Sequence, residues 1–334
     1  MSLEPFLKQS LWWVAADGPH FDLAGGREAM ADRIDITVLV DNYIDIFVPS
    51  TEVATYPVPG RASQLWAEQG LSLWIEVYDK GMTKKILYDF GRSNQVLPHN
   101  AGILELDFGQ LDFLVLSHGH IDHYGSLFHV LERSGEPCKL ILHPSAYGSK
   151  RYIRRPNGTY FGPWEMDSRV FSQFGSRIEP KSAPSNLGSG IHVSGEVPKK
   201  TYFEPGMPNA FVEVDGERVH DKILDDQSIF IELEGKGIVV LTGCCHAGVV
   251  NTLMRAQEMF PEQRIYALIG GLHLNNADET QMEETISYLS QRQLSHISAL
   301  HCTGYYAQRL LMDKFKDRWI PNTVGARYTF VGNH

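Results

Sequence analysis

Four residue types that bind transition metals stand within six positions of the sequence, at His118, His120, Asp122 and His123. They come directly after the apolar run 113–116, so a buried strand delivers all four into one turn. Neutral imidazole and carboxylate are good ligands for Zn²⁺ and for neighbouring first-row metals. His118 and His120 can bind one ion, and Asp122 and His123 can face a second ion beside it. The spacing therefore predicts one or two Zn²⁺ ions, with Mn²⁺, Fe²⁺, Co²⁺ or Ni²⁺ as alternatives.

The elements that must position this cluster alternate between strands and helices. Gly119 and Gly125 are expected to let the backbone bend tightly around the cluster. Short β-branched and aliphatic runs predict strands over 36–40, 71–77, 85–90, 113–117, 140–142, 228–232, 237–242, 266–269 and 297–300. Helical periodicity is seen just after the cluster and over 249–259 and 279–292. Hairpins followed by βα units indicate a layered α/β sandwich.

Two stretches lack this regular pattern. Residues 1–35 are read as an N-terminal extension, and residues 36–334 as one domain. Within that domain, 147–208 is rich in Gly, Ser, Pro and aromatic residues and has little periodicity. We expect it to form a long loop or cap insert that covers the site and sets substrate choice.

Composition narrows the class of protein. The formal net charge is −10, which argues against nucleic acid as a general partner, because gripping phosphates needs a basic surface. No apolar stretch approaches the length of a membrane helix, and residues 1–22 do not read as a signal peptide. We therefore expect a cytoplasmic protein that acts on a small molecule. The sequence leaves the oligomeric state open, a homo-oligomer included.

The motif H-x-H-x-D-H after a hydrophobic strand resembles the signature of the metallo-β-lactamase fold superfamily. Further segments resemble one branch of it, the family of the methanopterin-pathway 7,8-dihydropterin-6-methyl-4-(β-D-ribofuranosyl)aminobenzene-5′-phosphate synthase. The segments that carry this likeness, in order, are 37–42 (TVLVDN), 70–73 (GLSL), 87–91 (LYDFG), 99–101 (HNA), 116–120 (LSHGH), 242–248 (TGCCHAG), 270–274 (GGLHL) and 301–304 (HCTG).

This resemblance implies a four-layer αββα sandwich of two similar halves, with a metal site at the sheet edges. It also implies which distant residues complete the site. His246 is assigned to the first ion together with His118 and His120, and His301 to the second ion together with Asp122 and His123. His273 follows a third strand and is given a substrate-facing role. Asp122 and His273 are the expected catalytic residues.

One departure from the family pattern concerns the bridge between the ions. Many superfamily members carry Thr-Gly-Asp where this chain has Thr-Gly-Cys, ending at Cys244, and that aspartate usually bridges both ions. Cys244 or Cys245 could bind metal as a thiolate, although buried cysteines are usually inert. Asp226 falls where many relatives place a histidine ligand. It could be a ligand, a partner that orients a histidine, or the start of a strand, and we favour the last.

The expected chemistry follows from the metal, which activates water and polarises an electrophile. We favour a metal-dependent hydrolase of a small anionic substrate, such as an ester, phosphoester or phosphoanhydride. The resemblance offers an alternative, a pterin-pathway transferase that displaces pyrophosphate. A third hypothesis is a non-catalytic sensor of a metal or small ligand. The basic run 150–155 (KRYIRR) could bind the anion, although such runs are more often solvated surface.

Overall fold

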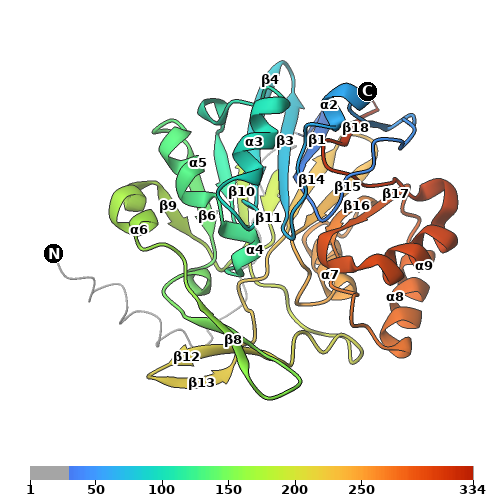
Figure 1. Cartoon of the computed structure of the whole chain (residues 1–334). Coiled ribbons are helices and arrows are strands. Elements are labelled where there is room, and N and C mark those ends of the chain that lie inside the picture. Colours follow the sequence, from blue (N-terminus) through green and yellow to red (C-terminus); the bar gives the residue numbers. More distant parts are fainter. Residues whose placement is uncertain (1–29, 334) are drawn as a thin grey trace.

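Two large sheets face each other in the computed structural model, which describes residues 30–333 (Figure 1). The first has eight strands in the order β2-β18-β1-β3-β4-β5-β6-β9. In chain order these are β1 (Arg33–Val40), β2 (Ala54–Thr55), β3 (Ser72–Asp79), β4 (Met82–Tyr88), β5 (Phe113–Val115), β6 (Lys139–Leu142), β9 (Ile178–Pro180) and β18 (Arg327–Val331). Strands β4, β5, β6 and β9 run parallel, so their carboxyl ends share one edge.

The second sheet has six strands in the order β10-β11-β14-β15-β16-β17. They are β10 (Ser185–Gly188), β11 (Ile191–Val193), β14 (Ile229–Leu233), β15 (Gly237–Thr242), β16 (Ile265–Gly271) and β17 (His296–Leu300). β14 and β15 form the hairpin that the sequence predicts, whereas β15, β16 and β17 are parallel to one another. This sheet therefore also gathers several carboxyl ends at one edge.

Alternating side chains along the strands explain the layering. In β15, Val239 and Leu241 face the core between the sheets, while Ile238 and Val240 face the outer helices. One group of helices covers the first sheet, namely α3 (Val96–Ile103), α4 (Ile121–Tyr124), α5 (Leu127–Arg133) and α6 (Arg169–Phe174). The second sheet is covered by α7 (Val249–Met259), α8 (Glu279–Gln291) and α9 (Tyr305–Phe315). Short α2 (Pro59–Ala62) lies between β2 and β3 in the chain. The predicted four-layer αββα sandwich is confirmed.

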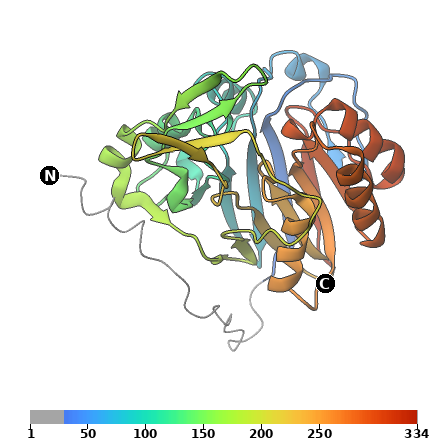
Figure 2. The same ribbon diagram turned by 90° about the horizontal axis from the view of Figure 1, so that it is seen from below.

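Residues 147–208 do not form one long loop, because they contain several strands, whereas their role as a cap over the site stays a prediction. β9 joins the first sheet, and β10 and β11 join the second. The remaining strands, β7 (Arg151–Arg154) and β8 (Tyr160–Trp164), pair with β12 (Ala210–Val214) and β13 (Glu217–His220) in a separate four-stranded sheet. These strands are only three to five residues long, and apart from the buried β11 most of them contain exposed or half-buried positions, so they leave no periodic apolar signal. In Figure 2 the yellow and green strands of this small sheet lie in front of the sandwich.

The chain ends bear on two further expectations. The proposed N-terminal extension falls, for residues 1–29, outside the described residues; strand β1 begins at Arg33, three positions before the expected start of the domain. Within residues 30–333, no helix has the length and apolar character that a membrane span requires.

Candidate metal centre

The predicted site residues come together where strands of both large sheets end. The 118–123 cluster follows β5, His246 follows β15, His273 follows β16 and His301 follows β17. One cavity of about 390 Å³ is lined by His120, Asp122, His246, His273 and His301. His118 and His123 do not line it, but their rings contact those of His246 and His301 respectively. The two glycines of the cluster are needed for close packing rather than for an unusual backbone angle. A Cβ on Gly119 would lie 2.4 Å from the Ala146 carbonyl oxygen, and one on Gly125 would lie 2.1 Å from the Arg92 carbonyl carbon.

The first expected triad brings three imidazoles to one point. Ligand nitrogens of His118, His120 and His246 all lie within 4.8 Å of one another. The Nε2 atoms of His118 and His246 are 3.1 Å apart. Two nitrogens bound to one tetrahedral zinc ion would be about 3.3 Å apart, given Zn–N distances near 2.05 Å. Burial and the neighbouring imidazoles lower the pKa of both His118 and His246 well below the ordinary value, so their nitrogens are in the neutral form that binds metal.

The second expected triad combines one carboxylate with two imidazoles. Asp122 Oδ2 lies 3.4 Å from His301 Nε2, and Asp122 Oδ1 lies 3.9 Å from His123 Nε2. The His301 Nε2 atom is buried and makes no hydrogen bond to any of the described residues. A buried nitrogen whose one polar contact is the 3.4 Å ion pair with Asp122 is poorly satisfied, and a metal ion would satisfy it. The donor types and their convergence therefore fit two transition-metal ions.

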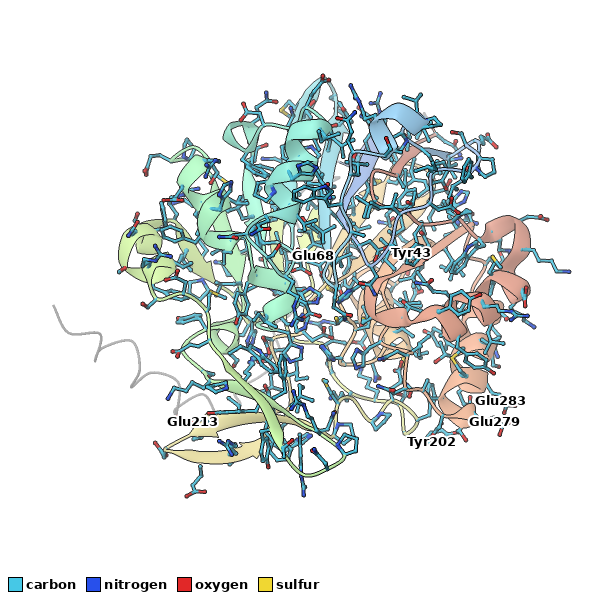
Figure 3. All side chains as sticks on the ribbon, viewed as in Figure 1. Tyr43, Glu68, Tyr202, Glu213, Glu279 and Glu283 are labelled. Carbon is cyan, nitrogen blue, oxygen red and sulfur yellow. The ribbon has the colours of Figure 1, made fainter. Side chains whose placement is uncertain are left out.

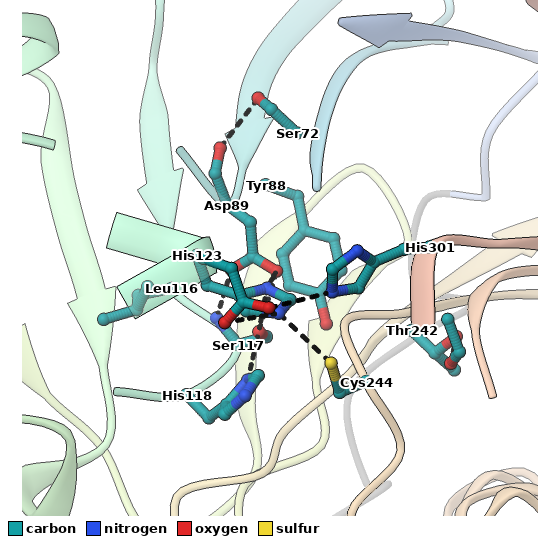
Figure 4. A network of polar contacts seen from close by, with 12 residues as sticks. Ser72, Tyr88, Asp89, Leu116, Ser117, His118, His123, Thr242, Cys244 and His301 are labelled. Atoms are coloured by element: carbon teal, nitrogen blue, oxygen red, sulfur yellow. Dashed lines mark hydrogen bonds and ion pairs between the residues drawn. The ribbon is translucent and has the colours of Figure 1, made fainter. Parts of the chain in front are cut away.

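A buried carboxylate fixes the orientation of the 118–123 cluster (Figure 4). Asp89, just past the end of β4, accepts hydrogen bonds from the Ser117 backbone N–H at 2.7 Å and the Ser117 hydroxyl at 2.7 Å. Its Oδ2 also lies 2.6 Å from His123 Nδ1. Because Nδ1 is held by Asp89, the Nε2 atom of His123 is the one directed toward the metal position. The Ser117 hydroxyl lies 2.9 Å from Nδ1 of His118, so the same network reaches the first triad.

The end of β1 supports His301 in a similar way. The Asn42 side-chain oxygen lies 3.1 Å from His301 Nδ1, and its amide nitrogen donates to the His301 carbonyl oxygen. Asp41 accepts the His301 backbone N–H at 2.8 Å. Neither Asp89 nor Asn42 was predicted as a site residue, although both lie in segments that carry the family resemblance. Carboxylate and amide residues at strand ends were the signal that would have identified them.

The segment before β14 joins the two histidine loops of the first triad. Asp225 accepts the Gly119 backbone N–H at 2.6 Å, and Asp226 accepts the Ala247 backbone N–H at 2.8 Å. Our preference for Asp226 as the start of a strand is wrong, because β14 begins only at Ile229. Both carboxylates are buried, and a buried carboxylate needs such donors. Asp226 therefore acts as a hydrogen-bonding support for the His246 loop.

Left-handed backbone conformations set the direction of several side chains in the candidate metal centre. Among residues 30–333, ten non-glycine residues have positive φ, and four of them belong to the site: Asp89 (63°), Cys245 (60°), His273 (45°) and His301 (48°). Such conformations cost free energy for residues that carry a Cβ, so they persist only where the surrounding structure enforces them. Their concentration at the strand ends is typical of a functional site.

Protonation of His123 gives the first prediction. Although burial works against the charged form, the Asp89 carboxylate raises the pKa of His123 to about 9. In metal-free protein, His123 should thus stay protonated at neutral pH and titrate near pH 9, as observed by NMR of the imidazole. Because this pKa exceeds the ordinary 6.5, the resulting stabilisation is present in full below pH 6.5 and is lost as pH rises through 9. A His123 titration below pH 6.5 in the metal-free protein would contradict this prediction.

The cavity has an aromatic wall and one cationic side chain. The wall comes from the small sheet and from Met207, and comprises Ile153, Phe161, Trp164 and Met207. Among the described residues that line this cavity, Arg92 is the single arginine or lysine. Arg92 is exposed and also lines a neighbouring cavity of about 540 Å³. Sequence reasoning missed it because an isolated exposed arginine gives no pattern.

The structure does not support the basic run 150–155 as the anion-binding element. Arg151 is buried, with ion pairs to Asp225 at 2.8 Å and to Asp221 at 3.4 Å. Lys150 pairs at 3.0 Å with Glu213 of β12, which is labelled in Figure 3. Arg154 and Arg155 are exposed and do not line the cavity. Arg151 instead ties the small sheet to the Gly119 turn through Asp225.

The chain is similar to known proteins over most of its length. The sequence model described as "Metallo-beta-lactamase superfamily" matches residues 65–250. The chain is 29% identical over 282 residues to 7,8-dihydropterin-6-methyl-4-(beta-D-ribofuranosyl)-aminobenzene-5'-phosphate synthase of Methanocaldococcus jannaschii, covering 83% of this chain and 93% of that protein. An uncharacterized protein of the same organism is 30% identical over 244 residues, covering 73% and 87% respectively.

A solved structure confirms the fold independently. Tm1679, described as a metal-dependent hydrolase of the beta-lactamase superfamily, matches with a TM-score of 0.67 at 23% identity. The match covers 90% of this chain and all of that chain. At this identity the likeness establishes the sandwich and not the reaction.

Proposed function

The chain belongs to the metallo-beta-lactamase superfamily, and we propose that it is a metal-dependent hydrolase of a small anionic substrate, cleaving an ester, phosphoester or phosphoanhydride. The observation that carries this proposal is the meeting of two ligand triads, His118-His120-His246 and Asp122-His123-His301, at one cavity. When bound there, zinc or a similar ion supplies a nucleophile at neutral pH and polarises the bond under attack.

The chain's own residues divide the remaining tasks. Phe161 and Trp164 offer flat apolar surface that binds the body of the substrate and excludes water. His273 lines the cavity 4.4 Å, ring centre to ring centre, from His246. Although burial works against its charged form, a hydrogen bond with Cys302 raises the pKa of His273. We assign His273 the transfer of a proton to the leaving group, and we assign Asp122 the orientation of the attacking nucleophile in addition to metal binding.

The proposal is tested on protein purified without chelator. Elemental analysis should find up to two transition-metal ions per chain, and turnover should appear on a panel of esters, phosphoesters and phosphoanhydrides. Activity should disappear on chelation and return when Zn²⁺, Mn²⁺ or Co²⁺ is added. Fully metal-loaded protein that binds a small ligand tightly but turns over no compound of the panel would favour the sensor hypothesis instead.

Arg92 gives a prediction about the anionic part of the substrate. Hydrogen bonds to a charged group contribute about 1.5–3 kcal/mol, so Arg92→Gln should raise KM for an anionic substrate by roughly 10- to 100-fold. The effect on kcat should be small, since Arg92 is not a member of either ligand triad. Arg169→Gln is the matched control, because Arg169 lines only the neighbouring cavity and pairs with Asp167. An unchanged KM in the Arg92 variant would remove this residue from substrate recognition.

A transferase is the second candidate, favoured by the 29% identity to the synthase over most of both chains. In this reaction, a carbon nucleophile would displace pyrophosphate from an anionic substrate in the same cavity. The two candidates are separated by the dependence of pyrophosphate release on a second substrate. Release only after an aromatic acceptor is added supports the transferase, whereas release with water alone supports the hydrolase.

A further inference from the structure

One sulfur atom lies between the two triads. Cys244 Sγ is 3.1 Å from His123 Nε2. It lies within 4.8 Å of the ligand nitrogens of His118 and His123, and equally of those of His246 and His301. Cys244 is thus within reach of two members of each triad, and it lines the cavity in which they meet.

The backbone directs the Cys244 side chain toward the site and the Cys245 side chain away from it. Cys245 has a φ of 60°, so the two consecutive cysteines face different surroundings. Cys245 Sγ lies 3.8 Å from the Thr252 hydroxyl and packs in the apolar core under α7. On the other side, Gly243 is pressed against the Ser117 side chain, where a Cβ would lie 2.3 Å from the hydroxyl oxygen. These contacts fix the end of β15 so that Cys244 faces the site.

We infer that Cys244 is a seventh metal ligand whose thiolate bridges the two ions. This inference rests on the proposed binuclear centre and adds to its six ligands. A sulfur and a nitrogen bound to one tetrahedral zinc ion lie about 3.5 Å apart, given Zn–S near 2.3 Å and Zn–N near 2.05 Å. The observed 3.1 Å between Cys244 Sγ and His123 Nε2 is close to that spacing. On binding, the S–H bond breaks, its proton passes to solvent, and two sulfur–metal bonds form.

Charge supports the same assignment. Two divalent ions bring four positive charges into a buried site, and among the six expected ligands Asp122 alone is anionic. The other five bind metal as neutral imidazoles. A second anionic ligand between the ions would reduce their mutual repulsion, which is strong in a buried site. Cys244 stands at the strand end where many superfamily members carry the bridging aspartate, so it supplies charge at the same place through sulfur instead of oxygen.

The inference is tested by replacing bound metal with Co²⁺ and recording the electronic absorption spectrum. A thiolate ligand gives an intense sulfur-to-cobalt charge-transfer band in the near ultraviolet. That band should be present in wild-type protein and in Cys245→Ser and Cys302→Ser, and absent in Cys244→Ser and Cys244→Ala. Loss of the bridge should also lower the binding affinity for both ions by more than about 100-fold, which exceeds the usual cost of losing a residue that only supports a ligand. Magnetic coupling between the two cobalt ions, seen by electron paramagnetic resonance, should disappear with the band.

A second measurement needs no variant. X-ray absorption at the zinc edge of wild-type protein should show a sulfur neighbour at about 2.3 Å. If two ions are bound but neither a sulfur neighbour nor a charge-transfer band is found, the inference about Cys244 is overturned. The proposal of a binuclear hydrolase would be unaffected by that result. A band that survives in Cys244→Ala but is lost in Cys302→Ser would also overturn it, and would transfer the ligand role to Cys302. A protein that binds no transition metal would instead refute the proposed function.

Discussion

The double variant His118→Ala with His120→Ala is expected to lose one of two bound ions and to lose turnover by well over 100-fold. Both imidazoles are buried, and both belong to the triad that His246 completes. Removing a residue that supports a ligand already costs roughly 10- to 100-fold in affinity or activity, so removing two direct ligands should empty the first position. Elemental analysis of dialysed protein gives the metal count, and initial rates on an active substrate give the loss of turnover.

The matched control removes two imidazoles that lie away from the centre. His99 stacks on Trp66, and His220 is exposed on β13. His99→Ala with His220→Ala should keep both ions and full turnover. If the His118/His120 variant is folded by circular dichroism and still retains two ions, those histidines are not ligands. The first triad would then have to be reassigned, with the Cys244, His246 and His273 group as the next set of donors.

Local patterns in the sequence were sufficient for the sandwich and for most of the expected donors. Buried strands such as β5 and β15 have continuous apolar runs, and a polar residue directly after such a run must lie at a sheet edge. Thus the position of the 118–123 cluster followed from one short segment. The meeting of His246 and His301 with that cluster depended on family resemblance, because no local pattern specifies which strand ends are neighbours.

The remaining features depend on contacts between distant segments. β7 pairs with β12 about sixty positions later, and neither strand has an alternating apolar pattern that would reveal this pairing. The environment of Arg151 likewise depends on a distant segment and cannot be predicted from the local sequence. In the sequence it belongs to a basic run typical of solvated surface, but in the structure its charge is buried against Asp225, 74 positions away. Only the folded chain determines whether such a charge faces solvent, a substrate or an opposite charge.

Asp89→Asn is expected to lower the binding affinity for the second ion by roughly 10- to 100-fold, although residue 89 is not itself an expected ligand. The Asp89 carboxylate accepts three hydrogen bonds, two from Ser117 and one from His123 Nδ1. An amide keeps one oxygen but turns an NH₂ group toward at least one of these donors. His123 would then lose the orientation that directs its Nε2 atom to the metal. A buried donor left without an acceptor also costs about 1–3 kcal/mol of stability.

Two measurements separate this positioning role from a general loss of stability. Calorimetric titration of Zn²⁺ should show the loss of affinity at the second position in protein that remains folded. In metal-free protein, the difference in unfolding free energy between wild type and variant should be largest below pH 6.5 and should shrink as pH rises through about 9, where wild-type His123 loses its proton. Asp79→Asn is the control, since Asp79 is equally buried but lies in the β3–β4 hairpin. Affinity within twofold of wild type for both ions in the Asp89 variant would show that His123 needs no carboxylate to bind its metal.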